Sequence, residues 1–122
     1  MTKSRACGEG SLTLLFSCSG GSDVGELADQ AARRLTQEGA GKMYCLAGIG
    51  GQIGGIVKTT EAADRIVVID GCQVGCGAAT LHQAGFRDFL HVCVTDLGLR
   101  KGTTEVGEPA IHTVAEAVKA VL

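Results

Sequence analysis

Cysteine is the residue type in this sequence with the greatest capacity for chemistry. Six cysteines stand among 122 residues, and three residues separate Cys72 from Cys76, a spacing within the range of zinc ligand pairs. Cys18 and Cys45 each lie at or near the end of a short apolar run. Thiolates hold zinc and iron–sulfur clusters, and they are also the nucleophiles of cysteine enzymes. The cysteines therefore indicate either a metal site or a thiol-based reaction.

The rest of the composition argues against a secreted protein cross-linked by three disulfides. Hydrophobic residues make up 45% of the chain, and its aliphatic runs and helical periodicity can build a core without covalent staples. The basic residues Lys3 and Arg5 are followed by Glu9, and the apolar run 12–16 is too short for an export signal. The longest uncharged stretch, 43–57, is too short to cross a bilayer. We therefore expect a cytoplasmic protein with no membrane partner, in which clustered cysteines more often bind metal or catalyse reactions.

Charge and aromatic content disfavour a nucleic-acid partner. The net charge is −2, from 11 Lys and Arg against 13 Asp and Glu, and aromatic residues make up only 3% of the chain. Such a chain lacks the basic surface that phosphate backbones require. Its length is that of one domain, so we expect a single α/β domain over residues 1–122, with residues 1–10 as an N-terminal arm. A homodimer through an edge strand or the last helix stays open.

Segments typical of strands alternate with segments typical of helices. Continuous apolar runs such as 66–69 are typical of buried parallel strands, whereas apolar residues three or four apart predict helices. This periodicity turns Ile53, Val74 and Val121 inward, and Asp23 with Glu26 resembles a capping box. The expected strands are residues 11–17, 42–47, 65–70 and 89–95, the expected helices are 23–38, 52–63, 73–83 and 109–121, and the expected loops are 48–51 and 97–107.

This alternation predicts a parallel sheet with helices on both faces, that is, a three-layer α/β domain. Right-handed crossovers leave few topologies, and the strand order 2-1-3-4 of a small doubly wound, Rossmann-like or flavodoxin-like sheet fits best. In such sheets, ligands bind at the carboxyl ends of the strands, where the strand order reverses.

The four cysteines of the candidate site all map to this carboxyl edge. Cys18 follows the first strand and Cys72 the third, and neighbouring strands lie about 4.8 Å apart. Cys76 is expected near the start of a helix, and Cys45 late in the second strand. The helix N-termini at this edge favour thiolates through their positive partial charge. Position alone leaves Cys45 open between a metal ligand and a small core residue.

The remaining cysteines and the histidines have simpler interpretations. Cys93 falls within the fourth strand and is expected in the core, and Cys7 receives no role. Histidine often binds metals, but we expect no ligand role for His82, His91 or His112.

Two glycine-rich segments suggest other chemistries, and both fit poorly. Residues 48–54, with Asp70 at the end of the next strand, resemble a dinucleotide fingerprint, but the spacing is G-x-G-x-x-x-G. Residues 18–22 could cradle a phosphate with Cys18 as nucleophile. A cysteine phosphatase loop would end on an arginine, whereas Glu26 follows here and would repel a phosphate.

Several motifs together resemble the DGC-domain family, to which zinc binding is attributed. They are the segments 16–22, 42–51 and 69–72 with Cys76, and the Asp70-Gly71-Cys72 segment carries the family's name. Residues 95–98 and Lys101 also resemble the family pattern, and the likeness runs from about residue 12 to the last helix. The resemblance implies zinc ligands at Cys18, Cys45, Cys72 and Cys76. Zinc binding is itself a prediction for this family, and no substrate comes with it.

The leading hypothesis is therefore a zinc-binding protein, with the metal as its partner and a structural or metal-handling role. The rival hypothesis is a thiol-dependent redox enzyme or oxyanion reductase, with Cys18 as nucleophile and Cys72 or Cys76 as resolving thiol. An iron–sulfur cluster is a minor alternative. The roles of Asp70 and Asp96 stay open between acid–base chemistry, support of the site and loop capping, although a buried Asp70 must find hydrogen-bond donors nearby.

Overall fold

A parallel four-stranded sheet forms the centre of the molecule in a computed structural model that describes residues 11–122. With the strands numbered along the chain, their order in the sheet is 2-1-3-4 and every pairing is parallel, which confirms the predicted α/β class and topology. Cys7 and the expected N-terminal arm 1–10 lie outside the described residues. The strands are β1 (Thr13–Ser17), β2 (Lys42–Met43), β3 (Arg65–Asp70) and β4 (Leu90–Cys93). The helices are α1 (Asp23–Gln37), α2 (Leu46–Gly50), α3 (Gly54–Glu61), α4 (Cys76–Gln83) and α5 (Glu108–Val121), with a 3-10 turn at Val94–Leu97.

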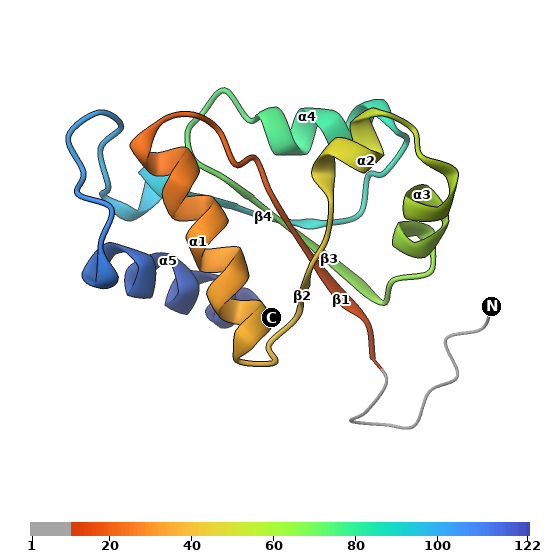
Figure 1. The fold of residues 1–122 in the computed structure, drawn as a ribbon, viewed down its shortest axis with the longest axis horizontal. Coiled ribbons are helices and arrows are strands. Elements are labelled where there is room, and N and C mark those ends of the chain that lie inside the picture. The colour runs from red at the N-terminus through yellow and green to blue at the C-terminus, as the bar shows by residue number, and fades with distance from the viewer. Residues whose placement is uncertain (1–10) are drawn as a thin grey trace.

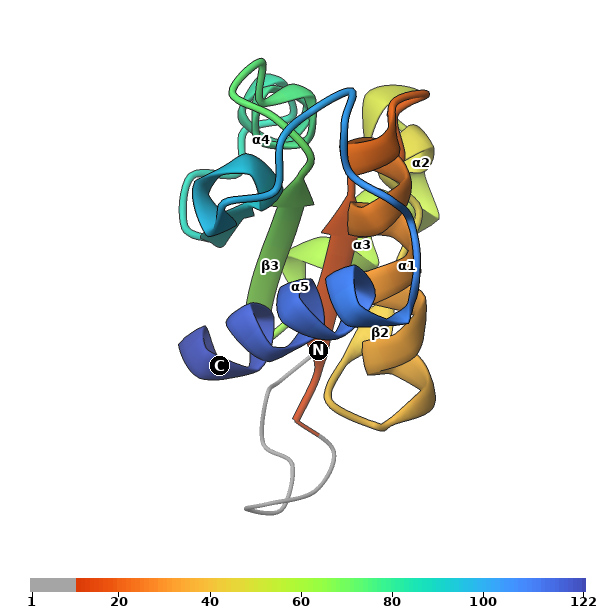
Figure 2. The same cartoon turned by 90° about the vertical axis from the view of Figure 1, so that its left-hand side faces the viewer.

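Helices cover both faces of the sheet (Figure 1). Because successive side chains of a strand point to opposite faces, the apolar runs of β1 and β3 supply two cores at once. Leu15, Val67 and Ile69 pack with α1 and α5, and Phe16 and Val68 pack on the opposite side with α2 and α4. Figure 2 shows β1 and β3 side by side, with their carboxyl ends at the same edge. The fold therefore brings the segments that follow these two strands together.

The second strand is shorter than the sequence predicts. It ends at Met43, and the last ladder contact runs from the Tyr44 amide to the Leu15 carbonyl at 2.9 Å. Cys45 then serves as the N-cap residue of α2, so part of the expected strand 42–47 and the expected loop 48–51 is helical instead. The apolar run contains both elements, and apolar character alone does not distinguish a short strand from a short helix.

Three side chains that were predicted to point inward are exposed. The relative exposure is 54% for Ile53, 72% for Val74 and 43% for Val121. Ile53 precedes α3, and Val74 lies in the turn 72–75 before α4, which begins at Cys76 rather than at residue 73. A helical periodicity extended past the true helix start assigns the wrong face to such residues.

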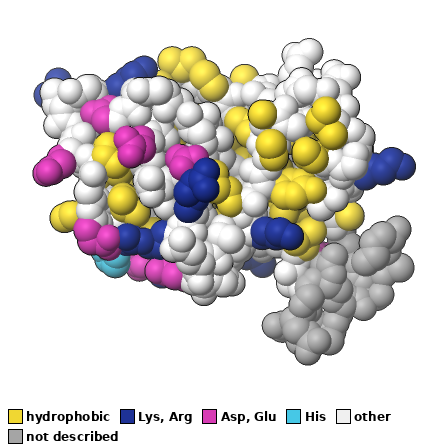
Figure 3. Space-filling view, viewed as in Figure 1, with side chains coloured by type: hydrophobic (Ala, Val, Ile, Leu, Met, Phe, Trp, Pro, Cys, Tyr) yellow, Lys and Arg dark blue, Asp and Glu magenta, His cyan; other side chains and the backbone are white. Residues whose placement is uncertain are grey.

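In the space-filling view, hydrophobic side chains gather over α2 and α3, and acidic ones gather on the α1 side (Figure 3).

The first turn of α1 is capped one residue earlier than the sequence predicts. The N-cap residue is Ser22, whose hydroxyl accepts a hydrogen bond from the Gly25 amide at 3.1 Å. The Asp23 carboxylate instead accepts the amide N–H groups of Gly102, at 2.8 and 2.9 Å, and of Thr104, at 3.0 Å. These bonds hold the loop between the 3-10 turn and α5 against α1.

The pKa of Asp23 lies below its ordinary value because the amides of Gly102 and Thr104 donate to the charged carboxylate. Because the pKa of Asp23 is lower in the folded state, its hydrogen bonds to the loop stabilise the fold at pH values above the pKa of the unfolded chain, about 3.9. Its contribution is lost as the pH falls through the lower folded value. We expect the Gly102 and Thr104 amide resonances to titrate together in this acidic range in a proton–nitrogen NMR series.

The matched variant is Asp23→Asn, whose side chain carries no charge. Faster amide hydrogen exchange at both loop positions at neutral pH is the expected result, with the sheet amides unchanged. Equal exchange rates in Asp23→Asn and the wild type would show that other contacts hold the loop.

Candidate functional site

The carboxyl edge of β1 and β3 brings two of the predicted site residues into neighbouring segments. Cys18 directly follows β1, and its amide continues the ladder to the Ile69 carbonyl at 3.0 Å. Its Sγ accepts a hydrogen bond from the Gly71 amide, with 3.3 Å between sulfur and nitrogen. The Cys18 sulfur therefore lies against the residue that precedes Cys72. Both cysteines are half-buried.

Cys72 has a cation beside it. The Nζ atom of Lys101 lies 3.5 Å from the Cys72 Sγ. Lys101 belongs to the loop that Asp23 anchors through the next residue, Gly102. A side chain on α1 thus determines where a positive charge stands at the edge of the sheet.

Cys45 and Cys76 both stand at helix starts and are exposed. Cys76 is the first residue of α4 and follows Gly75, whose φ of 70° lies in the left-handed region that glycine accepts without strain. Cys45 and Cys18 line one cavity, which also contains Thr80 from the second turn of α4. Cys72 and Cys76 are not among the residues that line this cavity.

The donor types suit a thiophilic metal, but their positions do not yet form a coordination shell. All five cysteines within residues 11–122 are free thiols, and zinc prefers such donors. Within the same residues, no group of three or more His, Cys, Asp or Glu side chains is gathered closely enough to hold a metal ion. Binding one ion through all four candidate cysteines would therefore require side chains at this edge to move.

The buried side chain of Asp70 links the elements that surround this edge of the sheet. Its carboxylate is 1% exposed and accepts the amide N–H groups of Gly77 at 2.6 Å and Ala78 at 3.1 Å, both in the first turn of α4. The His91 ring lies at hydrogen-bond distance as well, with Nε2 2.8 Å from the carboxylate. The carboxylate therefore joins β3, β4 and α4, and it positions the helix start that carries Cys76.

The contact between His91 and Asp70 is one that the sequence pattern did not predict. Val68 pairs with His91 and Asp70 with Cys93 in the β3–β4 register. Since Val68 and Asp70 lie two residues apart on β3, they face the same side of the sheet, as does His91. Strand parity could have found this contact once the register was known. The bonded Asp70 carboxylate also weakens the dinucleotide interpretation, in which that carboxylate would bind a ribose.

Gly71 allows the helix α1 to approach the edge. A Cβ atom at this position would lie 2.7 Å from the Gly25 nitrogen and from the Val24 carbonyl carbon. Both atoms belong to the backbone, which cannot swing away as a long side chain can. The three residues of the Asp70-Gly71-Cys72 segment thus contribute different features, namely a tie to α4, a close contact with α1 and a thiol at the edge.

Cys93 and Asp96 have local partners. Cys93 is buried, as predicted, and its Sγ lies 3.3 Å from the Thr95 hydroxyl and 3.5 Å from the Gln73 amide nitrogen. The same Gln73 nitrogen donates to the Asp96 carboxylate at 2.6 Å. Asp96 therefore supports the turn that contains Cys72 and Gln73, which argues for a supporting role among the three left open by the sequence.

The fold and the edge define an α/β domain with a doubly wound parallel sheet and a cysteine-bearing carboxyl edge. The chain belongs to the DGC-domain family, whose domain profile matches residues 14–118. It is 33% identical over 90 residues to the anaerobic and virulence modulator AnvM of Pseudomonas aeruginosa, a match that covers 74% of this chain and 69% of that protein. No solved structure matches the chain. No helix within residues 11–122 combines the length and apolar character needed to span a membrane.

Replacing Gly71 by alanine tests the close contact between the edge and α1. We expect Gly71→Ala to lower the free energy of unfolding by about 1–3 kcal/mol, since overpacking against backbone forces a shift of α1. Gly21→Ala is the matched control, because nothing lies within 4 Å of a Cβ atom there. The control should change stability by less than about 0.5 kcal/mol. Urea unfolding of both variants measures the difference, and equal stabilities would contradict the close-approach argument.

Proposed function

We propose that this domain binds a zinc ion through thiolates at the carboxyl edge of its sheet. The proposed ligands are Cys18, Cys45, Cys72 and Cys76. The observation that carries the proposal is the contact between the Cys18 sulfur and the Gly71 amide at 3.3 Å, which places two ligand-bearing segments against each other. Membership of the DGC-domain family supports a metal-binding role for the domain.

The electrostatics of the edge favour an anionic metal centre. Four thiolates on one Zn²⁺ leave a formal charge of −2, which donors around the sulfurs must offset. The Gly71 amide points at Cys18, and the Lys101 ammonium stands 3.5 Å from Cys72. Cys76 begins α4, where helix N–H groups add positive partial charge. These donors all lie at the edge of the sheet that carries the proposed ligands.

The number of ligands determines what the centre does. A site closed by four thiolates suits a structural or metal-handling role, whereas three thiolates would leave a position for water or a thiol. Cys45 and Cys76 are exposed at helix starts. The proposed four-thiolate site requires these two exposed side chains to turn towards the half-buried pair Cys18 and Cys72.

A second candidate function is thiol-dependent reduction of a small substrate such as an oxyanion. One observation favours it: the Cys18 sulfur lies 3.3 Å from the amide of Gly71, the residue before Cys72, so the nucleophile and a resolving cysteine stand in adjacent segments. Cys18 would attack, Cys72 or Cys76 would resolve the intermediate, and the new disulfide would leave two electrons and two protons on the substrate.

Cysteine-to-serine variants test the zinc proposal directly. We expect protein purified without oxygen to contain one zinc per chain by elemental analysis, and Cys72→Ser to lose it, because a serine hydroxyl stays protonated at neutral pH. Cys72→Ser should also unfold more readily, since metal binding contributes to folding free energy. Cys93→Ser is the control and should keep the metal. Its hydroxyl meets Gln73 and Thr95, so the cost should stay below the roughly 1–3 kcal/mol of an unpaired buried hydroxyl.

Other outcomes distinguish the alternatives. Protein that contains no transition metal and takes none up would contradict the zinc proposal. If the cysteines of metal-free protein react with a thiol reagent only after a reductant is added, the redox enzyme is favoured. Brown protein with visible absorbance would indicate an iron–sulfur cluster. Metal loss confined to Cys93→Ser would assign the site to other cysteines.

A further inference from the structure

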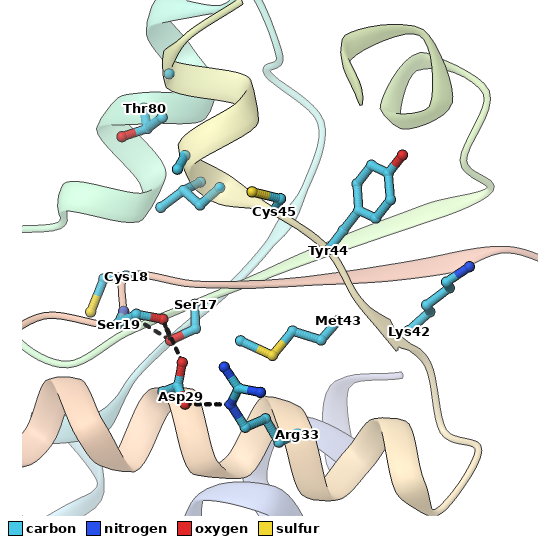
Figure 4. Close-up of a pocket in the computed structure, with 13 residues that line it drawn as sticks. Ser17, Cys18, Ser19, Asp29, Arg33, Lys42, Met43, Tyr44, Cys45 and Thr80 are labelled. Atoms are coloured by element: carbon cyan, nitrogen blue, oxygen red, sulfur yellow. Dashed lines mark hydrogen bonds and ion pairs between the residues drawn. The ribbon is translucent and has the colours of Figure 1, made fainter. Parts of the chain in front are cut away.

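A cavity of about 850 Å³ opens between α1, β2 and the start of α2 (Figure 4). Its volume falls within the range of small-molecule binding sites, about 300–1,000 Å³. The thiols of Cys18 and Cys45 line it, but so do residues that have no part in the proposed zinc site. Those residues are both charged and apolar, and their arrangement determines what the cavity can hold.

A chain of hydrogen bonds holds one arginine at the cavity. The Nε of Arg33 donates to Asp29 at 2.7 Å, and the Ser19 hydroxyl donates to the other Asp29 oxygen at 2.8 Å. The Ser19 amide in turn donates to the buried Ser17 hydroxyl at 3.0 Å. Ser19 adopts a φ of 50°, which is uncommon for a residue other than glycine. The end of β1 therefore fixes Asp29, and Asp29 fixes the guanidinium.

The guanidinium keeps its binding capacity. Only Nε is used, and no residue in the described part of the chain pairs with the two Nη groups of Arg33. These groups form the planar fork that matches a carboxylate. Burial raises the pKa of Asp29, but the hydrogen bonds from Arg33 and Ser19 outweigh it and leave the pKa below its ordinary value. Asp29 therefore remains a charged anchor at neutral pH.

Charge and shape select the class of ligand. The cavity carries two cations, Arg33 and Lys42, against the single carboxylate of Asp29, although the chain as a whole has a net charge of −2. The ammonium of Lys42 points away from Arg33 (Figure 4). A ligand would therefore pair with the Arg33 guanidinium alone and not with both cations. A single fork suits a carboxylate better than a phosphate dianion. Beside it, Met43, which packs on the same face of the sheet as α1, supplies an apolar surface.

We propose that this cavity binds a small organic carboxylate. The carboxylate lies on the free Nη groups of Arg33, and the apolar body of the ligand lies against Met43. The site goes beyond the proposed zinc centre and does not depend on it, although Cys18 and Cys45 are also among the residues that line the cavity.

Three probes separate the contributions to binding in the full-length, reduced protein. Benzoate carries both a carboxylate and an apolar body, benzamide has the same shape without the charge, and inorganic phosphate has the charge without the body. Proton–nitrogen NMR titrations follow the amides of Ser19 and Tyr44. We expect saturable shifts with benzoate. Benzamide should bind at least about tenfold more weakly because it lacks the charged hydrogen-bond pair. Phosphate should bind at least about tenfold more weakly because it lacks the apolar body that benzoate buries.

Arg33→Gln removes the fork and should weaken benzoate binding about tenfold. Arg33 is 61% exposed, so the variant should fold. Arg87→Gln is the control, because Arg87 is exposed and lines a different cavity. It should bind benzoate as the wild type does. Repeating the titration after chelation and after addition of zinc separates this proposal from the zinc proposal, since benzoate should bind the chelated protein.

Three results would overturn the carboxylate site. They are the absence of saturable shifts at Ser19 and Tyr44, equal benzoate affinity in Arg33→Gln and the wild type, and equal losses in Arg33→Gln and Arg87→Gln. Phosphate or benzamide binding as tightly as benzoate would also reject it, because the ligand class rests on both charge and apolar contact.

Discussion

The buried carboxylate of Asp70 is the interaction on which the functional edge depends. A carboxylate with 1% exposure costs free energy unless donors replace the water it has lost. Two backbone amides at the start of α4 do so, and His91 approaches from β4. Because the central strand cannot bury this group without them, the positions of α4 and β4 are coupled to the end of β3. The position of Cys76, the first residue of α4, therefore depends on the hydrogen bonds of Asp70.

Close backbone contact complements this polar tie on the other face of the sheet. At Gly71 the chain passes so near the first turn of α1 that no side chain fits between them. The Gly71 amide donates to the Cys18 sulfur, and the sulfur of the next residue, Cys72, lies 3.5 Å from the Lys101 ammonium. One short segment after β3 thus relates two helices and two thiols to each other. This explains in physical terms why an Asp-Gly-Cys sequence suits the position.

Helix α1 serves the edge in two further ways. Its first residue, Asp23, anchors the loop that brings Lys101 to Cys72. Two turns later, Asp29 holds Arg33 beside the cavity that Cys18 and Cys45 share. In both cases a carboxylate that accepts several hydrogen bonds fixes the position of a side chain or loop that carries a positive charge. The zinc proposal and the carboxylate proposal therefore draw on the same scaffold while resting on different residues.

The sequence by itself determined the parallel sheet, its strand order and the shared edge of Cys18 and Cys72. Periodicity and chain connectivity are local properties, and right-handed crossovers leave few ways to arrange the strands they predict. Local pattern did not determine where β2 ends, which face Val74 takes, or that His91 meets Asp70. Only the tertiary structure decided the anchoring of Gly102 by Asp23 and the placement of Arg33 at a cavity. Each of these contacts joins two separate elements, and the end of β2 is set by the neighbours against which that segment packs. Both therefore depend on how the elements pack together rather than on the residues within any one of them.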